Sequence, residues 1–468
     1  MKAARKARAT RSKPTICLIS LGCAKNTVDS ECLLGEFIQR GFLIAEQPAD
    51  ADLCLVNTCG FIAEAREETA GVLREVGRLR QHGILQGVFA LGCLAERVAK
   101  VPELASFLEQ ADRRVMFAEY PRLPDLCIGF LQGVEAQPAP DGAARPSFLR
   151  FLEMPRARIG SPHTAYLKIS EGCSNGCRFC CIPMIRGRQA SRPMEVVVRE
   201  AESLIAAGAR EINLIAQDTT SYGRDLYGGY KLAELLRQLA GVGANAWFRL
   251  MYAFPRHLGD NILECLAGDL RFCPYIDLPL QHISDPVLRA MGRGFSKDQT
   301  IQLLERIARH LPEGVVLTAF IVGFPGETVA QFNELLAFFG EGRFAHVGVF
   351  TYSPEAGTPA ARDADPVPRE VKDARRGALM EAQLAVSRRR QRRRIGRQAT
   401  VMLDGPAPRQ ARLPEGVWAV WRSQLEAPEV DGVIYLRGRK PKGIEPGDRV
   451  DAVITGALDY DAVAEPRP

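Results

Sequence analysis

Six short apolar strand patterns alternate with helical patterns between residues 159 and 385, and this alternation constrains the fold more than any other feature. The predicted strands are Tyr166–Ser170, Glu211–Ala216, Trp247–Ala253, Tyr275–Leu278, Val315–Ile321 and His346–Tyr352. Helical patterns such as Val196–Ala207, Leu232–Leu239 and Thr300–His310 separate them. Strand–helix alternation predicts a parallel sheet covered by helices. Six such units predict an open, barrel-like sheet that binds ligands at the carboxyl ends of its strands.

Two smaller domains are predicted to flank this barrel. Residues 14–127 contain three apolar strands, each followed by a helical pattern, which indicates a parallel α/β domain. These strands are Thr15–Leu21, Asp52–Asn57 and Gly87–Leu91. Residues 395–466 show short alternating runs that favour a small β-barrel. We therefore expect an α/β chain with a basic disordered arm (1–13), the N-terminal domain (14–127), a proline-containing linker (128–158), the central domain (159–390) and the C-terminal barrel (395–466).

Composition excludes several classes of protein. Hydrophobic residues make up 46% of the chain and charged residues 25%, which is ordinary for a globular protein. The longest nearly uncharged apolar stretch, 314–324, is shorter than the roughly 18 residues that a membrane span needs. The basic N-terminus has no apolar core after it, so we predict no secretory signal. Thirteen cysteines, an odd number, favour reduced thiols in the cytoplasm over a disulfide framework.

Three cysteines follow the first barrel strand with the spacing Cys-x3-Cys-x2-Cys: Cys173, Cys177 and Cys180. Three thiolates can bind three irons of a [4Fe–4S] cluster and leave the fourth iron open. An open coordination position marks a reactive metal site. A zinc site would need a fourth ligand, and the adjacent Cys181 is poorly placed to supply it. We therefore predict a reactive cluster here and interpret Cys181 as a small buried hydrophobe.

A second triad becomes visible when cysteines are placed on the N-terminal strands. Cys23, Cys59 and Cys93 each follow the carboxyl end of a predicted strand, in a loop that also carries a glycine. Because parallel strands end at a common edge, the three thiols are expected to converge and to hold a second cluster with an open iron. The other cysteines lack this pattern and are interpreted as structural: Cys17, Cys32, Cys54, Cys127, Cys265 and Cys273.

The first triad resembles the signature of the radical S-adenosylmethionine superfamily. The order of the three domains resembles the methylthiotransferase family, with a C-terminal TRAM-type barrel for substrate binding. This resemblance implies that Cys173, Cys177 and Cys180 are catalytic, because their cluster would bind S-adenosylmethionine and cleave it to a 5′-deoxyadenosyl radical. It also implies that the N-terminal cluster presents or donates sulfur and that a second S-adenosylmethionine supplies the methyl group. The product would carry a new C–S–CH3 group.

Five segments resemble the RimO-type branch of this family, which modifies the β-carbon of an aspartate in ribosomal protein S12. They are 20–31, 168–173, 216–223, 277–282 and 427–436. Residues 395–468 hold 10 Lys/Arg and 11 Asp/Glu, and this near-neutral balance suits a basic ribosomal protein better than tRNA phosphates. The partners implied are S12, free or in the small subunit, and an external low-potential electron donor. Methylthiolation of tRNA adenosine is the alternative, and a non-catalytic metal-containing ribosome-assembly factor is a second alternative.

Polar residues and glycines at other strand ends are the candidates for binding S-adenosylmethionine. They are Gln217, Asp218, Gln281, Gly323, Gly326 and Glu327. Three arginines after the cluster loop either form structural ion pairs or recognise the substrate carboxylate: Arg186, Arg188 and Arg192. Two basic strips, residues 1–13 and Arg388–Arg394, each carry six Lys/Arg and are either solvated or in weak contact with RNA.

Overall fold

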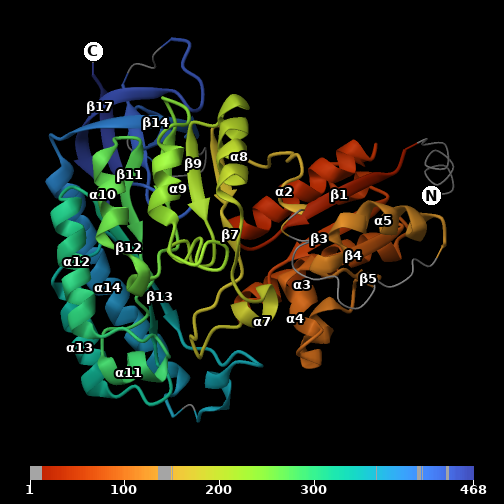
Figure 1. Ribbon diagram of the computed structural model, residues 1–468, viewed down its shortest axis with the longest axis horizontal. Coiled ribbons are helices and arrows are strands. Elements are labelled where there is room, and N and C mark those ends of the chain that lie inside the picture. The colour runs from red at the N-terminus through yellow and green to blue at the C-terminus, as the bar shows by residue number, and fades with distance from the viewer. Residues whose placement is uncertain are drawn as a thin grey trace.

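The computed structural model describes residues 13–134, 149, 151–364, 366–407, 413, 415–438 and 442–467. Nearly all of the predicted basic arm and much of the predicted linker lie outside these ranges. Within them the chain forms a parallel α/β domain, a central helix-covered parallel sheet and a small β-barrel (Figure 1). The predicted fold class is therefore confirmed.

The N-terminal domain is a five-stranded parallel sheet in the order β2-β1-β3-β4-β5. Its strands are β1 (Thr15–Ser20), β2 (Leu43–Ile44), β3 (Leu53–Thr58), β4 (Gly87–Gly92) and β5 (Arg113–Arg114). Its helices are α2 (Ala24–Gln39), α3 (Ala63–Gln81), α4 (Cys93–Val98) and α5 (Leu123–Leu131). The three predicted strands form the centre, where β3 and β4 are buried along their whole length. The edge strands β2 and β5 were not predicted, because two residues carry no periodic pattern.

The central domain is a six-stranded, all-parallel sheet in the order β13-β12-β11-β10-β9-β6, and it does not close. Its strands are β6 (Thr164–Lys168), β9 (Glu211–Ile215), β10 (Trp247–Leu250), β11 (Phe272–Asp277), β12 (Val315–Val322) and β13 (His346–Thr351). Its longer helices are α8 (Met194–Ala206), α9 (Leu232–Leu239), α10 (Asp260–Gly268), α11 (Asp285–Ala290), α12 (Lys297–His310), α13 (Val329–Gly340) and α14 (Arg369–Arg394). A short hairpin-like pair, β7 (Ser170–Glu171) and β8 (Ala190–Ser191), and helix α7 (Ile182–Arg186) frame the cysteine loop.

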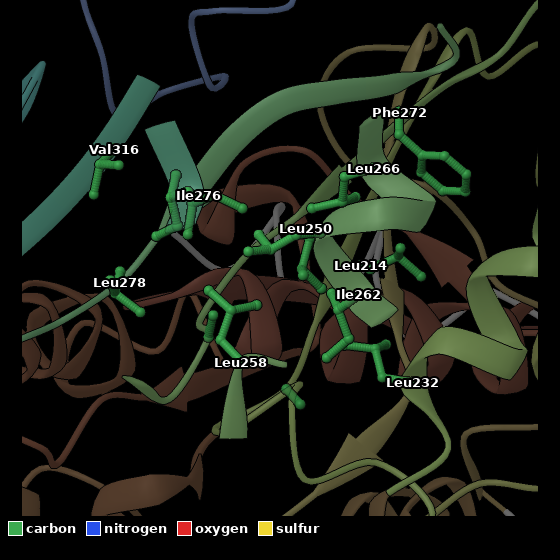
Figure 2. Close-up of a cluster of buried hydrophobic side chains, with 14 of the residues drawn as sticks. Leu214, Leu232, Leu250, Leu258, Ile262, Leu266, Phe272, Ile276, Leu278 and Val316 are labelled. Carbon is green, nitrogen blue, oxygen red and sulfur yellow. The ribbon is translucent and has the colours of Figure 1, made fainter. Parts of the chain in front are cut away.

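Apolar side chains between this sheet and its helices form the largest core (Figure 2). Leu214 and Leu250 stand side by side in the register of β9 and β10, and Ile276 continues the row on β11. Ile262 and Leu266 of α10 pack against them. Each fully buried side chain of this size stabilises the fold by about 1.5–3 kcal/mol. The core thereby fixes the carboxyl edge of the sheet, where the cysteine loop begins.

The C-terminal domain is a closed five-stranded barrel in the order β14-β15-β16-β18-β17. Its strands are β14 (Gln398–Pro406), β15 (Val417–Arg422), β16 (Ile434–Arg437), β17 (Arg449–Ala457) and β18 (Ala462–Pro466). The alternating runs of the sequence correspond to four of these strands: Ala399–Leu403, Gly416–Trp421, Val433–Leu436 and Arg449–Ile454. The fifth, β18, was not predicted, although its parallel pairing with β16 helps to close the barrel. The barrel packs on the amino ends of the central strands, where Arg422 pairs with Glu211 at 2.8 Å. It therefore lies at the opposite end of the sheet from the cysteine loop.

Among the helices that the structure describes, none has the length and apolar character that crossing a membrane requires.

Candidate active site between two cysteine triads

The loop of Cys173, Cys177 and Cys180 connects β7 to α7 at the carboxyl edge of the central sheet. Its backbone is fixed at both ends: Cys173 N donates to Gly187 O at 3.1 Å, and Arg178 N donates to Met291 O at 2.9 Å. Burial raises the pKa of Cys173 to about 11 and that of Cys180 well above its usual range, and the charge of Cys177 contributes to both shifts. Cationic irons would stabilise these buried thiols as thiolates, so the loop suits an iron–sulfur cluster.

The second triad converges as predicted at one edge of the N-terminal sheet. Cys23 precedes α2, Cys59 follows β3 and Cys93 is the first residue of α4, so the prediction that Cys93 lies in a loop was wrong. Burial raises the pKa of Cys93 to about 12; Arg186 opposes this shift, whereas Cys23 and Cys59 add to it. β1, β3 and β4 are neighbours in one parallel sheet, so the three cysteines lie at the same edge of it. This donor set fits a second iron–sulfur cluster on the same grounds as the first.

Glycine at position 22 makes this convergence possible. Gly22 has φ +91°, a backbone conformation that other residues rarely adopt. A Cβ atom at Gly22 would also lie 2.9 Å from the Cβ of Cys59. A larger residue would therefore push two of the three cysteine loops apart.

A buried charged network links the two triads. Arg186, on α7 behind the first cysteine loop, donates to Cys93 Sγ at 3.2 Å and pairs with Asp29 of α2 at 2.7 Å. It also pairs with Glu171, two residues before Cys173, at 3.1 Å. Arg186 therefore forms the structural ion pairs that were one of its two predicted roles. A guanidinium against the Cys93 sulfur also offsets negative charge on that ligand.

Lys168 completes this network. Its ammonium is fully buried and pairs with Asp29 and, at 2.8 Å, with Glu171. Burial alone would raise the pKa of Glu171, but the charges of Arg186 and Lys168 lower it to about 2. Glu171 is therefore charged at neutral pH. Removing one member would leave uncompensated charge in the interior, at a cost of about 3–5 kcal/mol.

The other two arginines of the predicted trio lie elsewhere. Arg192 is buried, pairs with Glu200 at 2.6 Å and donates to Lys168 O at 2.7 Å, so it has a structural role. Arg188 is exposed. A further buried arginine that the sequence did not reveal, Arg293, donates to Cys177 Sγ at 3.4 Å. It lies 113 residues beyond the nearest cluster cysteine of its motif, Cys180, so no local pattern could have indicated it.

The residues predicted to bind S-adenosylmethionine follow β9, β11 and β12, at the same edge as the cysteine loop. The carboxylate of Asp218 is buried and accepts from Asn175 of that loop at 2.8 Å, and Gln217 donates to Glu171 at 2.5 Å. These two side chains therefore hold the loop and the charged network in place. Gln281 has φ +75° and joins β12 through its backbone.

The turn from Gly323 to Glu327 is shaped by its own carboxylate. Glu327 is buried, accepts from the N–H groups of Gly323 and Phe324, and pairs with Arg375 at 3.2 Å. Gly323 and Gly326 both have positive φ. The carboxylate of Glu327 thus has its partners within the chain, and contact of this turn with S-adenosylmethionine stays a prediction.

Within the described residues, no three His, Cys, Asp or Glu side chains are arranged to hold a single metal ion. A [4Fe–4S] cluster binds each thiolate at a different iron, so its ligands stand farther apart than those around one zinc ion. The assignment of the six cysteines as cluster ligands stays a prediction that rests on their convergence.

An open, six-stranded parallel sheet with a Cys-x3-Cys-x2-Cys loop at its carboxyl edge defines a radical S-adenosylmethionine enzyme. Residues 167–339 match the model of the radical SAM superfamily, and residues 395–466 match that of the TRAM domain. Residues 15–113 match the uncharacterized protein family UPF0004. The solved methyltransferase TsrM from Kitasatospora setae shares the fold at a TM-score of 0.56 and 14% identity, over 80% of this chain and 89% of that chain.

Comparison with curated relatives identifies the family of this chain within the superfamily. The ribosomal protein uS12 methylthiotransferase RimO of Syntrophus aciditrophicus (strain SB) is 40% identical over 96% of this chain and 97% of that protein. The protein of the same name from Anaeromyxobacter sp. (strain K) is 41% identical over 95% of this chain and 91% of its own length. The chain therefore belongs to the RimO family of methylthiotransferases. It is an S-adenosylmethionine-dependent enzyme with two [4Fe–4S] clusters as cofactors.

Proposed function

We propose that this chain adds a methylthio group to the β-carbon of an aspartate in ribosomal protein S12. The observation that carries the proposal is the buried network of Arg186, Lys168, Asp29 and Glu171, which joins the two cysteine triads into one site. A single substrate can then meet both the sulfur source and the radical source. The curated relatives are ribosomal protein uS12 methylthiotransferases, which supports S12 as the substrate.

The roles of the residues follow from this placement. Cys173, Cys177 and Cys180 would hold the cluster that supplies an electron to S-adenosylmethionine, and the N-terminal triad would hold the cluster that presents sulfur. Arg186 positions the Cys93 ligand through its hydrogen bonds to Sγ. Asp218 positions the first loop through Asn175. Both loops are thus prearranged before substrate binds.

The alternative substrate, a tRNA adenosine, would require a basic surface near the barrel. Part of the arginine run is instead neutralised, because Arg388 pairs with Asp459 at 2.7 Å and Arg394 pairs with Glu426 at 2.6 Å. The exposed arginines 389, 392 and 393 provide at most a weak contact with ribosomal RNA. An external low-potential donor would supply the electrons. The reaction is placed in the cytoplasm, where thiols stay reduced.

Mass spectrometry on a strain that lacks this chain tests the proposal. Intact S12 is expected to lose the mass of one methylthio group, while nucleosides from digested tRNA of the same cells stay unchanged. Loss of methylthio-adenosine with unchanged S12 would instead establish the tRNA alternative. No change in either would leave the assembly-factor alternative, which iron analysis of the anaerobically purified protein would then examine.

A further inference from the structure

Lys25 is a largely buried lysine whose ammonium lacks a direct polar partner among the described residues. Only 7% of its surface is exposed, yet its ammonium forms no hydrogen bond or ion pair with any described residue. Every other buried lysine or arginine of the described chain has such a partner; Arg186 and Lys168 have carboxylates, and Arg293 has a sulfur and a carbonyl oxygen. The charges of Cys23 and Asp277 act on Lys25, but neither group accepts a hydrogen bond from its ammonium, which is therefore free to take an acceptor from outside the chain.

The position of Lys25 indicates which site the counter-charge would occupy. Lys25 is the second residue of α2, two residues after Cys23 of the N-terminal triad. Its ammonium lies 2.7 Å from the ring centroid of Tyr252, directly beyond β10 at the carboxyl edge of the central sheet. Lys25 therefore lies between the N-terminal triad and the carboxyl edge of the central sheet, where the Cys173–Cys180 loop begins.

Tyr252 and Asp277 surround the Lys25 ammonium without accepting a hydrogen bond from it. Tyr252 has φ +58°, a conformation that is strained for a tyrosine. The carboxylate of Asp277 accepts a hydrogen bond from the backbone N–H of Tyr252 at 3.0 Å, which helps to keep the tyrosine ring beside the Lys25 ammonium. A ring face offsets only part of the cost of burying a cation. The charge of Asp277 acts on Lys25, but the two side chains form no direct ion pair.

We propose that the Lys25 ammonium binds the side-chain carboxylate of the substrate aspartate and thereby holds its β-carbon between the two triads. The inference rests on the proposed function, because it assumes an aspartate substrate. A carboxylate is the one group of that side chain that could pair with a cation, and it is attached directly to the carbon that would be modified. Binding at Lys25 would supply the direct acceptor that its ammonium lacks among the described residues.

The test compares two forms of S12, one with the target aspartate and one with asparagine in its place, which keeps the shape and removes the charge. Their Kd values are measured anaerobically by calorimetry on the holoenzyme and on its Lys25→Met variant. The intact enzyme is expected to bind the aspartate form at least about tenfold more tightly, which corresponds to about 1.4 kcal/mol. Lys25→Met is expected to bind both forms equally, at the affinity of the asparagine form.

Lys297→Met serves as the matched control, because Lys297 is partly exposed and pairs with Glu334 at 2.8 Å. This variant should still bind the aspartate form of S12 about tenfold more tightly than the asparagine form. Discrimination that persists in Lys25→Met would overturn the inference. So would a Lys25→Met protein whose iron content falls from about eight toward about four atoms per chain, because Lys25 would then support the N-terminal cluster. Failure of the intact enzyme to bind either form of S12 would overturn the proposed function itself, and the two failures are therefore distinguishable.

Discussion

Burial opposes the charged form of the cysteine thiols in both triads, as one residue from each triad illustrates. The pKa of Cys173 is raised to about 11 and that of Cys93 to about 12. Cluster assembly must therefore release protons at neutral pH, and it converts each set of buried thiols into charged ligands. Arg186 beside Cys93 and Arg293 beside Cys177 are placed to stabilise that charge.

Single cysteine substitutions should separate the two clusters. Cys177→Ala is expected to abolish reductive cleavage of S-adenosylmethionine and to leave the N-terminal cluster in place. Cys59→Ala is expected to spare cleavage and to stop methylthiolation, since only the sulfur-presenting site is damaged. Each variant should retain about four of eight irons. Product analysis and iron determination on anaerobic protein check this, with Cys265→Ala, outside both triads, as the control. Modification of S12 by both variants would refute the two-cluster scheme.

At the scale of secondary structure, each triad depends on the carboxyl ends of parallel strands. β1, β3 and β4 end at one edge, and each delivers one cysteine within three residues of its last residue. The loops are tight because glycine allows a positive φ at Gly22 and at Gly92, where a Cβ would lie 2.3 Å from Asn57 Oδ1. Strand ends and two glycines therefore set the geometry of the N-terminal site.

Gly22→Ala tests this geometry. The substitution adds a Cβ at φ +91°, 2.9 Å from the Cβ of Cys59, so we expect a loss of about 1–3 kcal/mol in unfolding free energy and a poorly assembled N-terminal cluster. Urea unfolding and iron content provide the measurement. Gly71→Ala is the matched control: Gly71 lies in α3 with no atom near its Cβ position, so alanine should leave the cluster intact and stabilise the helix by up to about 1 kcal/mol. Equal cluster content in both variants would contradict the argument.

At the scale of the molecule, the three domains share one buried core and several buried ion pairs. Phe37 of the N-terminal domain, Trp247 of the central sheet and Met402 of the C-terminal barrel belong to the same apolar cluster. Arg66 and Arg97 of the N-terminal domain both pair with Glu355, which follows β13, at 2.5 and 2.8 Å. These contacts hold the two triads in a fixed relation.

Glu355→Gln should weaken the contact between the N-terminal and central domains. Two buried guanidinium groups would lose their shared carboxylate, so we expect a loss of about 3–5 kcal/mol in unfolding free energy. The N-terminal domain should also become more sensitive to limited proteolysis, while the central domain keeps its resistance. Glu234→Gln removes an exposed partner of Lys231 and should cost at most about 1 kcal/mol. If the two variants were equally stable, Glu355 would not be a determinant of the domain interface.

The sequence by itself determined the strands that carry the active site, because apolar periodicity is local and the cysteines follow it directly. It also determined the order of the three kinds of domain, and it predicts which cysteines form the two triads. The two-residue strands β2 and β5, and the short β18, were missed because their pairing partners lie far away along the chain.

Only the tertiary structure decided how the charged residues are used. Arg186, Lys168, Asp29 and Glu171 come from three separate segments, and no local pattern shows that they pair with one another. Lys25 differs from these pairs only because folding buries its ammonium against Tyr252 without a carboxylate. Charge pairing depends on distances across domains and on burial, and neither quantity exists until the chain has folded.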